Sequence, residues 1–360
     1  MTYRVRLDRF AQISAALSLQ TDSKLAQLVD EAEQLGSGIG GTTLALEVEG
    51  IKVFAKRVRL TDLERRPENQ MSTANIFGLP AFFQRNVGSV GFGVWRELAA
   101  HAMTTGWVLS QRTESFPLMY HWRQLDGAAA PRAAPLPYGL ADIDAMVSYW
   151  DGGEALRTRL QALAGATASV MIFLEFVPWT LSEWLERQLN AGLEALEAAC
   201  TMVERCVMVD VPLMNSLGLV HGDAHFRNLL TDGRRVYFAD LGLATSKRFA
   251  LSIEEQHYLH HHVSLDRGYI RAKWVNWLVQ ACCPAVSSPQ ERMELVRAIA
   301  QGRAAGVLAD LPATVAESIR RHAQVATAIN DFYVQLHCTC RSAPFPREDV
   351  EALLLAETEQ

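Results

Sequence analysis

Two kinds of hydrophobic pattern divide the chain near residue 178. In the first part, apolar and polar residues alternate in "TLALEVEG" (43–50) and "IKVFAKRV" (51–58), which predicts two strands joined by a turn at Glu-Gly. "FPLMYHWRQL" (116–125) and "ASVMIFLEFVP" (168–178) predict further strands. After Pro178, apolar residues recur every three to four positions almost to the end, which predicts helices. The pattern therefore predicts an α+β protein with a strand-rich first half and a helix-rich second half.

The remaining segments of the first half have other patterns. Residues 1–34 and "VWRELAAHAMTTGWVL" (94–109) predict helices, whereas 61–93 is long and irregular. "DGAAAPRAAPLPYG" (126–139) is typical of a surface loop or insertion, and we expect a short helix over 141–164 after it. In "SIEEQ", Ser252 and Glu255 have the spacing of a capping box, which predicts the start of a helix.

Length, charge and cysteine spacing narrow the class of protein. A chain of 360 residues suits one large domain or two lobes. The formal charge of −6 does not favour a nucleic-acid partner. No apolar run approaches a membrane span, and the N-terminus does not have the pattern of a signal peptide, so we expect no membrane association. Six scattered cysteines, including those of "HCTC" (337–340), predict buried free thiols and not disulfides or a metal site. These features together lead us to expect a cytoplasmic protein.

A glycine cluster and a lysine give the first candidate site. Glycines in "GSGIGG" (36–41) let the backbone approach a ligand closely and turn N–H groups toward phosphate oxygens, although a tight turn is an equal alternative. Lys56 follows Gly41 by 15 residues at the end of the predicted hairpin. Its neighbours Val53, Phe54 and Ala55 are apolar, so the ammonium needs an anionic partner unless it lies at the surface.

Glu97 is the candidate partner of Lys56. It lies in "VWRELAAH" on a predicted amphipathic helix, where a locally paired surface glutamate is the alternative. Glu64 and Glu68 are weaker candidates, because their surroundings are charged. A second glycine cluster, "GSVGFG" (88–93), precedes this helix and favours a helix-entry turn over a second phosphate nest.

The second candidate site is "LVHGDAHFRNLL" (219–230) followed by "VYFADLGLA" (236–244). Asp223 and Asn228 lie in one predicted loop, and Asp240 follows the next strand. Carboxylate and amide oxygens of this kind suit Mg²⁺ together with a catalytic base. We expect a hairpin that presents Asp223, Asn228 and Asp240 at one end, rather than a polar hairpin held only by backbone bonds, because an aspartate embedded in apolar sequence is costly without a cation.

These motifs resemble those of the protein-kinase-like superfamily. "HGDAHFRN" looks like the aminoglycoside phosphotransferase and choline kinase branch, and "DLGLA" looks like the Asp-Phe-Gly segment of protein kinases. The order of elements over about residues 30–245 also agrees with that superfamily. The resemblance implies a two-lobed protein-kinase-like fold, with a small antiparallel-sheet N-lobe in 1–177 and a larger, mostly helical C-lobe in 178–360 that holds the catalytic loop and the metal-binding segment.

The resemblance also implies a role for each candidate residue. Asp223 is expected to be the catalytic base, Asn228 and Asp240 the Mg²⁺ ligands, and Lys56 with Glu97 the ion pair at the α- and β-phosphates of ATP. The backbone of Glu175 and Val177, in "FLEFVP", is expected to hold adenine. The nucleotide-binding glycine loop would comprise Gly36, Ser37, Gly38, Gly40 and Gly41. His225 either lies near the γ-phosphate or supports the loop, and His221 is expected to be structural.

The sequence is compatible with several functions. The leading one is an ATP- and Mg²⁺-dependent kinase that phosphorylates a hydroxyl of a small molecule, either aminoglycoside-like or another metabolite. The segment after Asp240 contains no Ala-Pro-Glu motif, which disfavours a peptide-docking platform. An atypical serine/threonine protein kinase is the alternative enzyme, and a nucleotide-binding pseudokinase is the non-enzymatic alternative. The histidines of "HYLHHH" (257–262) are expected to form a solvated or substrate-facing patch and not a metal site.

Overall fold

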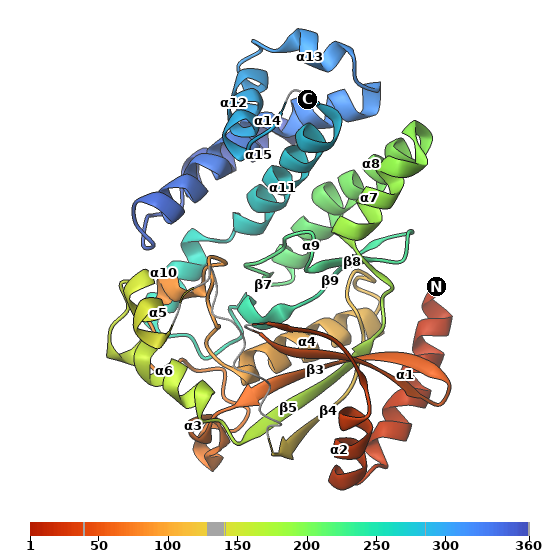
Figure 1. The fold of residues 1–360 in the computed structure, drawn as a ribbon, viewed down its shortest axis with the longest axis vertical. Coiled ribbons are helices and arrows are strands. Elements are labelled where there is room, and N and C mark those ends of the chain that lie inside the picture. Colours follow the sequence, from red (N-terminus) through yellow and green to blue (C-terminus); the bar gives the residue numbers. More distant parts are fainter. Residues whose placement is uncertain (39, 128–139, 141, 285, 359–360) are drawn as a thin grey trace. The chain divides into compact units, whose positions relative to one another are not determined.

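The computed structural model describes residues 1–38, 40–127, 140, 142–284 and 286–358. It has an α+β fold, with a five-stranded antiparallel sheet in the first part of the chain and mainly helices in the rest (Figure 1). Two compact units are present. The first comprises Met1–Val177 and Ala239–Gln256, and the second comprises Pro178–Phe238 and His257–Gln360. The sequence pattern predicts one change at 177/178; the contacts also group the segment after Phe238 with the first unit.

The sheet of the first unit has the order β1-β2-β3-β5-β4. Its strands are β1 (Glu33–Gly38), β2 (Gly41–Val48), β3 (Ile51–Leu60), β4 (Met119–Asp126) and β5 (Ala168–Glu175). Val48 pairs with Ile51, and the two turn residues Glu49 and Gly50 have φ angles of 52° and 72°. Positive φ at both positions is the geometry of a type I′ hairpin turn, and it lies at the Glu-Gly pair where the sequence predicts a turn. β1 is not predicted, because its glycines hide the strand pattern.

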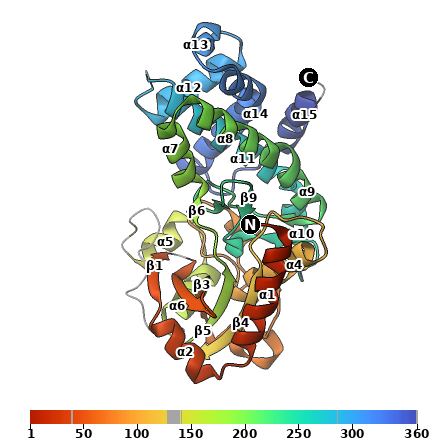
Figure 2. The ribbon, with the colours of Figure 1, turned by 90° about the vertical axis from the view of Figure 1, so that its right-hand side faces the viewer.

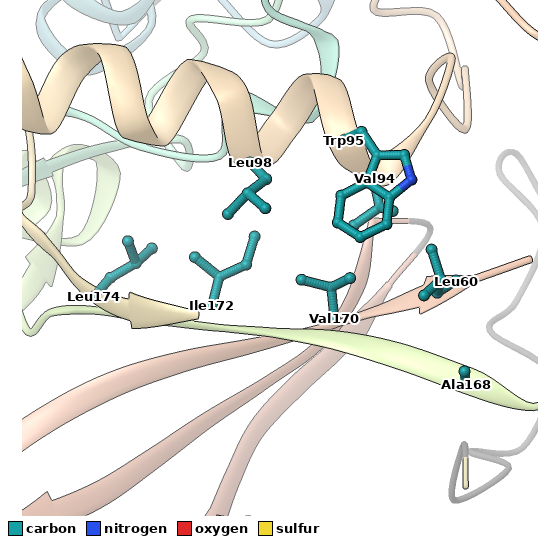
Figure 3. Close-up of a cluster of buried hydrophobic side chains, with 8 residues drawn as sticks. All are labelled: Leu60, Val94, Trp95, Leu98, Ala168, Val170, Ile172 and Leu174. Carbon is teal, nitrogen blue, oxygen red and sulfur yellow. The ribbon is translucent and has the colours of Figure 1, made fainter. Parts of the chain in front are cut away.

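Helix α4 (Val94–Leu109) covers one face of this sheet. The alternate residues of β5 on that face, Ala168, Val170, Ile172 and Leu174, pack against Val94, Trp95 and Leu98 of the helix (Figure 3). The other residues of β5 point to the opposite face, where α1 (Tyr3–Ser18) and α2 (Asp22–Asp30) contact strands of the sheet. The core therefore has two layers, and β5 is buried on both faces.

Shorter elements complete the first unit. Between β3 and α4 lie α3 (Asp62–Arg65) and the 3₁₀ helices η1 (Pro67–Asn69) and η2 (Ala81–Gln84). In place of one helix over 141–164 the structure has α5 (Ile143–Tyr149) and α6 (Glu154–Ala164), because the chain turns at Asp151, whose φ is 49°. Of the predicted loop at 126–139, residues 128–139 lie outside the described residues. After Phe238 come η5 (Leu241–Leu243) and β10 (Thr245–Ser246).

The second unit is mainly helical (Figure 2). A small antiparallel sheet has the order β6-β8-β9, from β6 (Trp179–Thr180), β8 (Leu229–Thr231) and β9 (Val236–Phe238). β7 covers Leu219–Val220. The helices are α7 (Leu181–Ala191), α8 (Leu193–Arg205), the π-helical turn η4 (Cys206–Asp210), α9 (Val211–Ser216), α11 (Leu265–Cys282), α12 (Pro289–Ala300), α13 (Ala305–Ala309), α14 (Ala313–Cys338) and α15 (Arg347–Thr358). Helix α10 (Ile253–His261) begins with the predicted capping box, in which Ser252 and Glu255 exchange backbone-to-side-chain hydrogen bonds.

A buried ionic network joins three helices of the second unit. His322 of α14 is fully buried, with Nε2 3.1 Å from Glu204 of α8 and Nδ1 3.2 Å from Glu357 of α15. Burial alone would raise the pKa of Glu204, but hydrogen bonds from His322 and Ser318 and nearby positive charge lower it to about 2. Burial also acts to lower the pKa of His322, yet the two glutamates raise it above 6.5. The protonated form of His322 therefore stabilises the helix bundle.

We expect His322→Phe to lower the free energy of unfolding by about 1–3 kcal/mol in mildly acidic solution, because two buried carboxylates lose a charged donor. The folded pKa of His322 lies above its unfolded value, so the stabilisation is complete below pH 6.5 and is lost as the pH rises through the folded pKa. Urea unfolding of both proteins at pH 6 and pH 9 measures the difference. Arg297→Gln, which breaks a half-exposed ion pair with Asp331, is the control and should change stability little at either pH. A difference for His322→Phe that stays constant between pH 6 and pH 9 would contradict the assignment.

Candidate functional site

Lys56 lies at the centre of the first group of candidate residues. It lies on β3, opposite Thr43 of β2 and Ile172 of β5, and only 4% of the residue is exposed. Its Nζ donates to Glu97 Oε1 at 2.6 Å and to Asp240 Oδ1 at 2.7 Å. The pair with Glu97 is the one expected from the sequence. The contact with Asp240, 184 residues away in the sequence, adds a second carboxylate to the same ammonium.

The charges of this group are unequal. Burial acts to lower the pKa of Lys56, but the two neighbouring carboxylates raise it, so Lys56 keeps its positive charge. Burial and the nearby Asp240 raise the pKa of Glu97, while Lys56 acts to lower it. One ammonium between two carboxylates leaves an excess of negative charge when both acids are ionised. The side chain of Asp240 is 44% exposed, so a cation from solvent has access to it.

Asp240 adopts an unusual backbone conformation. Its φ and ψ angles are 54° and 75°, in the left-handed region, and its Oδ1 accepts a hydrogen bond from Gly242 N–H at 3.4 Å. A side chain at Gly242 would place its Cβ 3.4 Å from both Asp240 Oδ1 and Glu97 Oε2. The Asp-Leu-Gly sequence thus gives Asp240 a backbone donor and leaves the space between the two carboxylates open. Left-handed non-glycine residues often lie in functional sites.

The predicted glycine loop is the hairpin of β1 and β2, and its turn lies at Lys56. A Cβ at Gly40 would be 3.1 Å from Lys56 Nζ and 3.9 Å from Asp240 Oδ2. Gly41 has a φ of 125°, and a Cβ there would collide with Arg57 O. Gly36 and Gly38 are in β1, where a Cβ meets only Thr43 Oγ1 at 3.4 Å or open space, and Ser37 pairs with Thr42. Gly40 therefore lies against the buried ammonium, where a side chain would crowd it.

Glu64, the weaker candidate for the lysine partner, has another function in the fold. It is 1% exposed, and its Oε1 accepts from the Val94 N–H at 3.0 Å, at the N-terminus of α4. Its Oε2 accepts from Arg159 at 3.0 Å. A Cβ at Gly93 would be 2.9 Å from Glu64 Oε1, so the second glycine cluster forms a helix-entry turn closed by this carboxylate. Glu68 is exposed. Glu64 thereby fixes the first turn of the helix that carries Glu97.

The segment after Asp240 is attached to α4 and to the irregular segment before it. Arg96, next to Glu97, is buried and binds Glu255 through Nη2 at 2.6 Å. Its Nε donates to Thr73 O at 2.7 Å, and Thr73 Oγ1 accepts from the Ala250 N–H at 2.9 Å. Residues 61–93 therefore act as a support for the chain that follows the candidate metal ligand, a contact that the sequence does not indicate.

The second group of candidate residues lies in the loop 221–228 of the second unit. Asn228 Nδ2 donates to both the backbone oxygen and Oδ2 of Asp223, each at 3.1 Å. His225 Nδ1 accepts from the N–H groups of Arg227 and Asn228 at 3.2 and 3.3 Å. Because Nδ1 accepts, the proton of a neutral His225 lies on Nε2, which is 3.8 Å from Asp223 Oδ2. His225 therefore supports the loop; the alternative position near a γ-phosphate stays a prediction.

Asp266 holds the backbone of this loop. Its Oδ2 accepts from the His221 N–H at 2.7 Å and its Oδ1 from the Gly222 N–H at 2.9 Å, with a further bond from Asn215 at 2.9 Å. Asp266 is 1% exposed. His221 is fully buried, and its Nδ1 accepts from the Asp223 N–H at 3.3 Å, which agrees with a structural role. The role of Asp266 cannot be predicted from the sequence, because an acid in the first turn of a helix is common for local reasons.

Lys273, also on α11, is a second residue whose role cannot be predicted from the sequence. It is half-buried, with Nζ 4.9 Å from the ring centre of Tyr269 and 6.0 Å from that of Tyr333. Burial lowers the pKa of Lys273, Asp223 acts to raise it, and Arg292 acts to lower it. Within the described part of the chain, no carboxylate lies within ion-pair distance of its ammonium. Helix α11 thus fixes the loop through Asp266 and adds a positive charge that interacts with Asp223.

The backbone candidates at Glu175 and Val177 lie at the end of β5. Glu175 is 4% exposed, and its carboxylate is bound by Arg6 of α1. Its side chain is therefore committed to the protein interior. Val177 is the last residue of this part of the first unit.

Two minor expectations are corrected. In "HYLHHH", His257, His260 and His261 are exposed, but His262 is buried and stacks on Tyr258 with ring centres 3.8 Å apart. The six cysteines are free, but only Cys200, Cys206 and Cys283 are buried; Cys282 and Cys340 are half-buried and Cys338 is exposed. Local sequence does not reveal these differences, because they depend on which side of a helix meets a neighbouring element.

No protein-family model matches the sequence, and no curated protein matches it. Among the residues that the structure describes, none of the helices combines the length and the apolar composition that a bilayer crossing needs. The chemistry of the two residue groups is therefore the basis for assigning a function.

We expect Asp266→Ala to destabilise the protein by about 2–4 kcal/mol, because two buried N–H groups lose a charged acceptor. Amide hydrogen exchange of residues 221–223 should accelerate more than that of the β-sheet in the first unit. Asp310→Ala, at an exposed position, is the matched control and should change neither quantity. Unchanged protection at 221–223 in Asp266→Ala would show that the loop is held by other contacts.

Proposed function

We propose that this chain is an ATP- and Mg²⁺-dependent kinase that transfers the γ-phosphoryl group to a hydroxyl, with a two-lobed protein-kinase-like fold. The observation that carries the proposal is the buried Lys56, which contacts both Glu97 and Asp240 beneath the glycine hairpin. Phosphoryl transfer depends mainly on positioning and charge neutralisation, and a lysine held by a helix glutamate is one of its recurring parts.

Each candidate residue has a role in this proposal. Lys56 would bind the α- and β-phosphates, with Glu97 fixing its ammonium, and backbone N–H groups of the glycine hairpin would bind phosphate oxygens. Asp223 would accept the proton of the acceptor hydroxyl, and Asn228 and His225 orient its loop. The backbone of Glu175 and Val177 would bind adenine.

Asp240 and Asn228 are the proposed ligands of the magnesium ion. Asp240 and Asn228 offer a carboxylate and an amide oxygen, which are hard ligands of the kind that Mg²⁺ takes alongside phosphate and water. The exposed part of the Asp240 carboxylate and the negative excess around Lys56 support this role. Bound Mg²⁺ would neutralise charge on the phosphates during transfer.

A small-molecule acceptor remains the favoured one. The Ala-Pro-Glu motif is absent from the sequence, and residues 252–256 begin a helix whose Glu255 is bound to Arg96. The pseudokinase alternative is disfavoured, because Lys56, Asp223, Asn228 and Asp240 are all retained. Lys273 bears on the charge of the acceptor. A half-buried ammonium that interacts with Asp223 favours a neutral or anionic acceptor over a cationic, aminoglycoside-like amine.

The first test is transfer of label from γ-labelled ATP with Mg²⁺ by wild-type protein and by Asp223→Asn. The acceptors are a cell extract divided into macromolecules and small molecules, and the small molecules are divided again by ion exchange into cationic, neutral and anionic fractions. We expect label in neutral or anionic small molecules, reduced about 10²- to 10⁴-fold in Asp223→Asn, with ATP affinity nearly unchanged.

Other outcomes of this test select other functions. Label in proteins that depends on Asp223 would promote the protein-kinase alternative. Label in cationic small molecules would restore an aminoglycoside-like acceptor. Transfer at an equal rate by Asp223→Asn would remove Asp223 from the role of base, and an absence of label would favour the pseudokinase.

A second test addresses the metal. We expect Asp240→Ala to weaken ATP binding measured with Mg²⁺ at least about tenfold, because a metal ligand is lost. Binding measured in EDTA should change less. Asp232→Ala, at an aspartate of the second unit that lies outside the proposed metal site, is the control. Equal effects of Asp240→Ala with and without the metal would contradict the assignment of Asp240.

A further inference from the structure

The first turn of α1 inserts an arginine beneath the sheet. Arg6 is fully buried, and its Nε donates to Glu175 Oε1 at 2.8 Å while its Nη2 donates to Glu175 Oε2 at 2.7 Å. The two side chains form a bidentate pair, 169 residues apart in the sequence, with Glu175 only 4% exposed. A planar guanidinium in this geometry fixes the direction of a carboxylate as well as its charge.

The same arginine binds the chain that enters β4. Its Nη1 donates to Glu114 O at 3.0 Å and its Nη2 to Phe116 O at 2.6 Å. Glu175 is attached to this chain as well, because its Oε2 accepts from the Leu118 N–H at 3.1 Å and its N–H donates to Leu118 O at 2.8 Å. The end of β5 is therefore held through both its side chain and its backbone.

Helix α1 also contacts the end of α4. The hydroxyl of Tyr3 lies 3.0 Å from Val108 O and 3.1 Å from Leu109 O, at the last turn of the helix that carries Glu97. Further along α1, Phe10 packs near Tyr120 of β4, with ring centres 6.3 Å apart. One N-terminal helix thus fastens the ends of the two elements that carry Glu97 and Glu175.

We propose that Arg6 is a positioning residue for the nucleotide: by binding the Glu175 carboxylate it fixes the backbone of 175–177 that would hold adenine. The inference rests on the proposed function and adds to it a specific determinant of base recognition outside the site. Because the side chain of Glu175 is bound by Arg6 and its N–H by Leu118 O, the backbone carbonyl is the group of this residue that would meet the base. The alternative is an ion pair that stabilises the fold and has no specific effect on the ligand.

A positioning role and a purely stabilising role of Arg6 predict different affinities for a ligand that has no base. We measure the affinity of the full chain for MgATP, MgGTP and magnesium tripolyphosphate. In Arg6→Met we expect at least about tenfold weaker ATP binding, since a misplacement of about 1 Å can cost about 10²-fold. Tripolyphosphate binding, which relies on Lys56 and the glycine hairpin, should be retained, and the preference for ATP over GTP should fall.

Three further variants separate positioning from general stability. Arg271→Met removes a comparable buried ion pair in the second unit, where Arg271 Nε lies 2.7 Å from Glu357 Oε2. This variant should leave the ratio of the affinities for MgATP and magnesium tripolyphosphate unchanged. Arg6→Met/Glu175→Met replaces both charges by apolar groups and should recover thermal stability while the ratio stays low. Glu175→Gln keeps the hydrogen-bonding shape, provides a folded variant if Arg6→Met does not fold, and should lower the ratio by a smaller amount.

The outcomes are decisive for each proposal. Suppose that the wild-type protein binds ATP, and that Arg6→Met weakens the binding of ATP and of tripolyphosphate equally or weakens neither. This result would overturn the role of Arg6 and leave the kinase proposal standing. A wild-type protein that binds neither MgATP nor tripolyphosphate would overturn the proposed function, and the inference about Arg6 with it.

Discussion

A buried ammonium is the constraint on which the first unit depends. Lys56 is buried on the central strand of the sheet, where an uncompensated charge is too costly to keep. The chain compensates it with Glu97 from α4 and Asp240 from a segment 184 residues away. Each of these carboxylates must be held in place, because Lys56 is stabilised only while both lie within hydrogen-bonding distance. Much of the remaining architecture fastens these two acids.

The residues that hold these two acids in place come from several separate segments of the chain. Glu64 closes the N-terminus of α4, and Tyr3 contacts its C-terminus, so the helix that carries Glu97 is held at both ends. Arg96 and Thr73 hold the chain that follows Asp240. In the second unit, Asp266 holds the loop of Asp223 in the same manner, through backbone N–H groups. In both units, buried acidic and arginine side chains thus hold the candidate residues in place.

The sequence predicts those parts of the molecule whose signals are local. Alternation and the Glu-Gly turn define β2 and β3, and the apolar surroundings of Lys56 indicate that it needs a partner. The capping box at Ser252 is a pattern of four residues and is predicted correctly. The function of Glu64, Asp266 and Arg6 is hidden, because each depends on a contact 30, 44 or 169 residues away. β1 is missed because glycine carries no side chain with which to show alternation, and the break between α5 and α6 depends on the conformation of Asp151.

The left-handed backbone of Asp240 has a consequence for the stability of this chain. Such a conformation costs a non-glycine residue on the order of 1 kcal/mol, and glycine would adopt it without that cost. A glycine at position 240 would relieve this strain, but it would also remove one of the two carboxylates that compensate the buried Lys56, so the backbone and the side chain of residue 240 affect stability in opposite directions. The position is thus a point of trade-off, where the backbone conformation favours glycine and the buried ammonium requires a carboxylate.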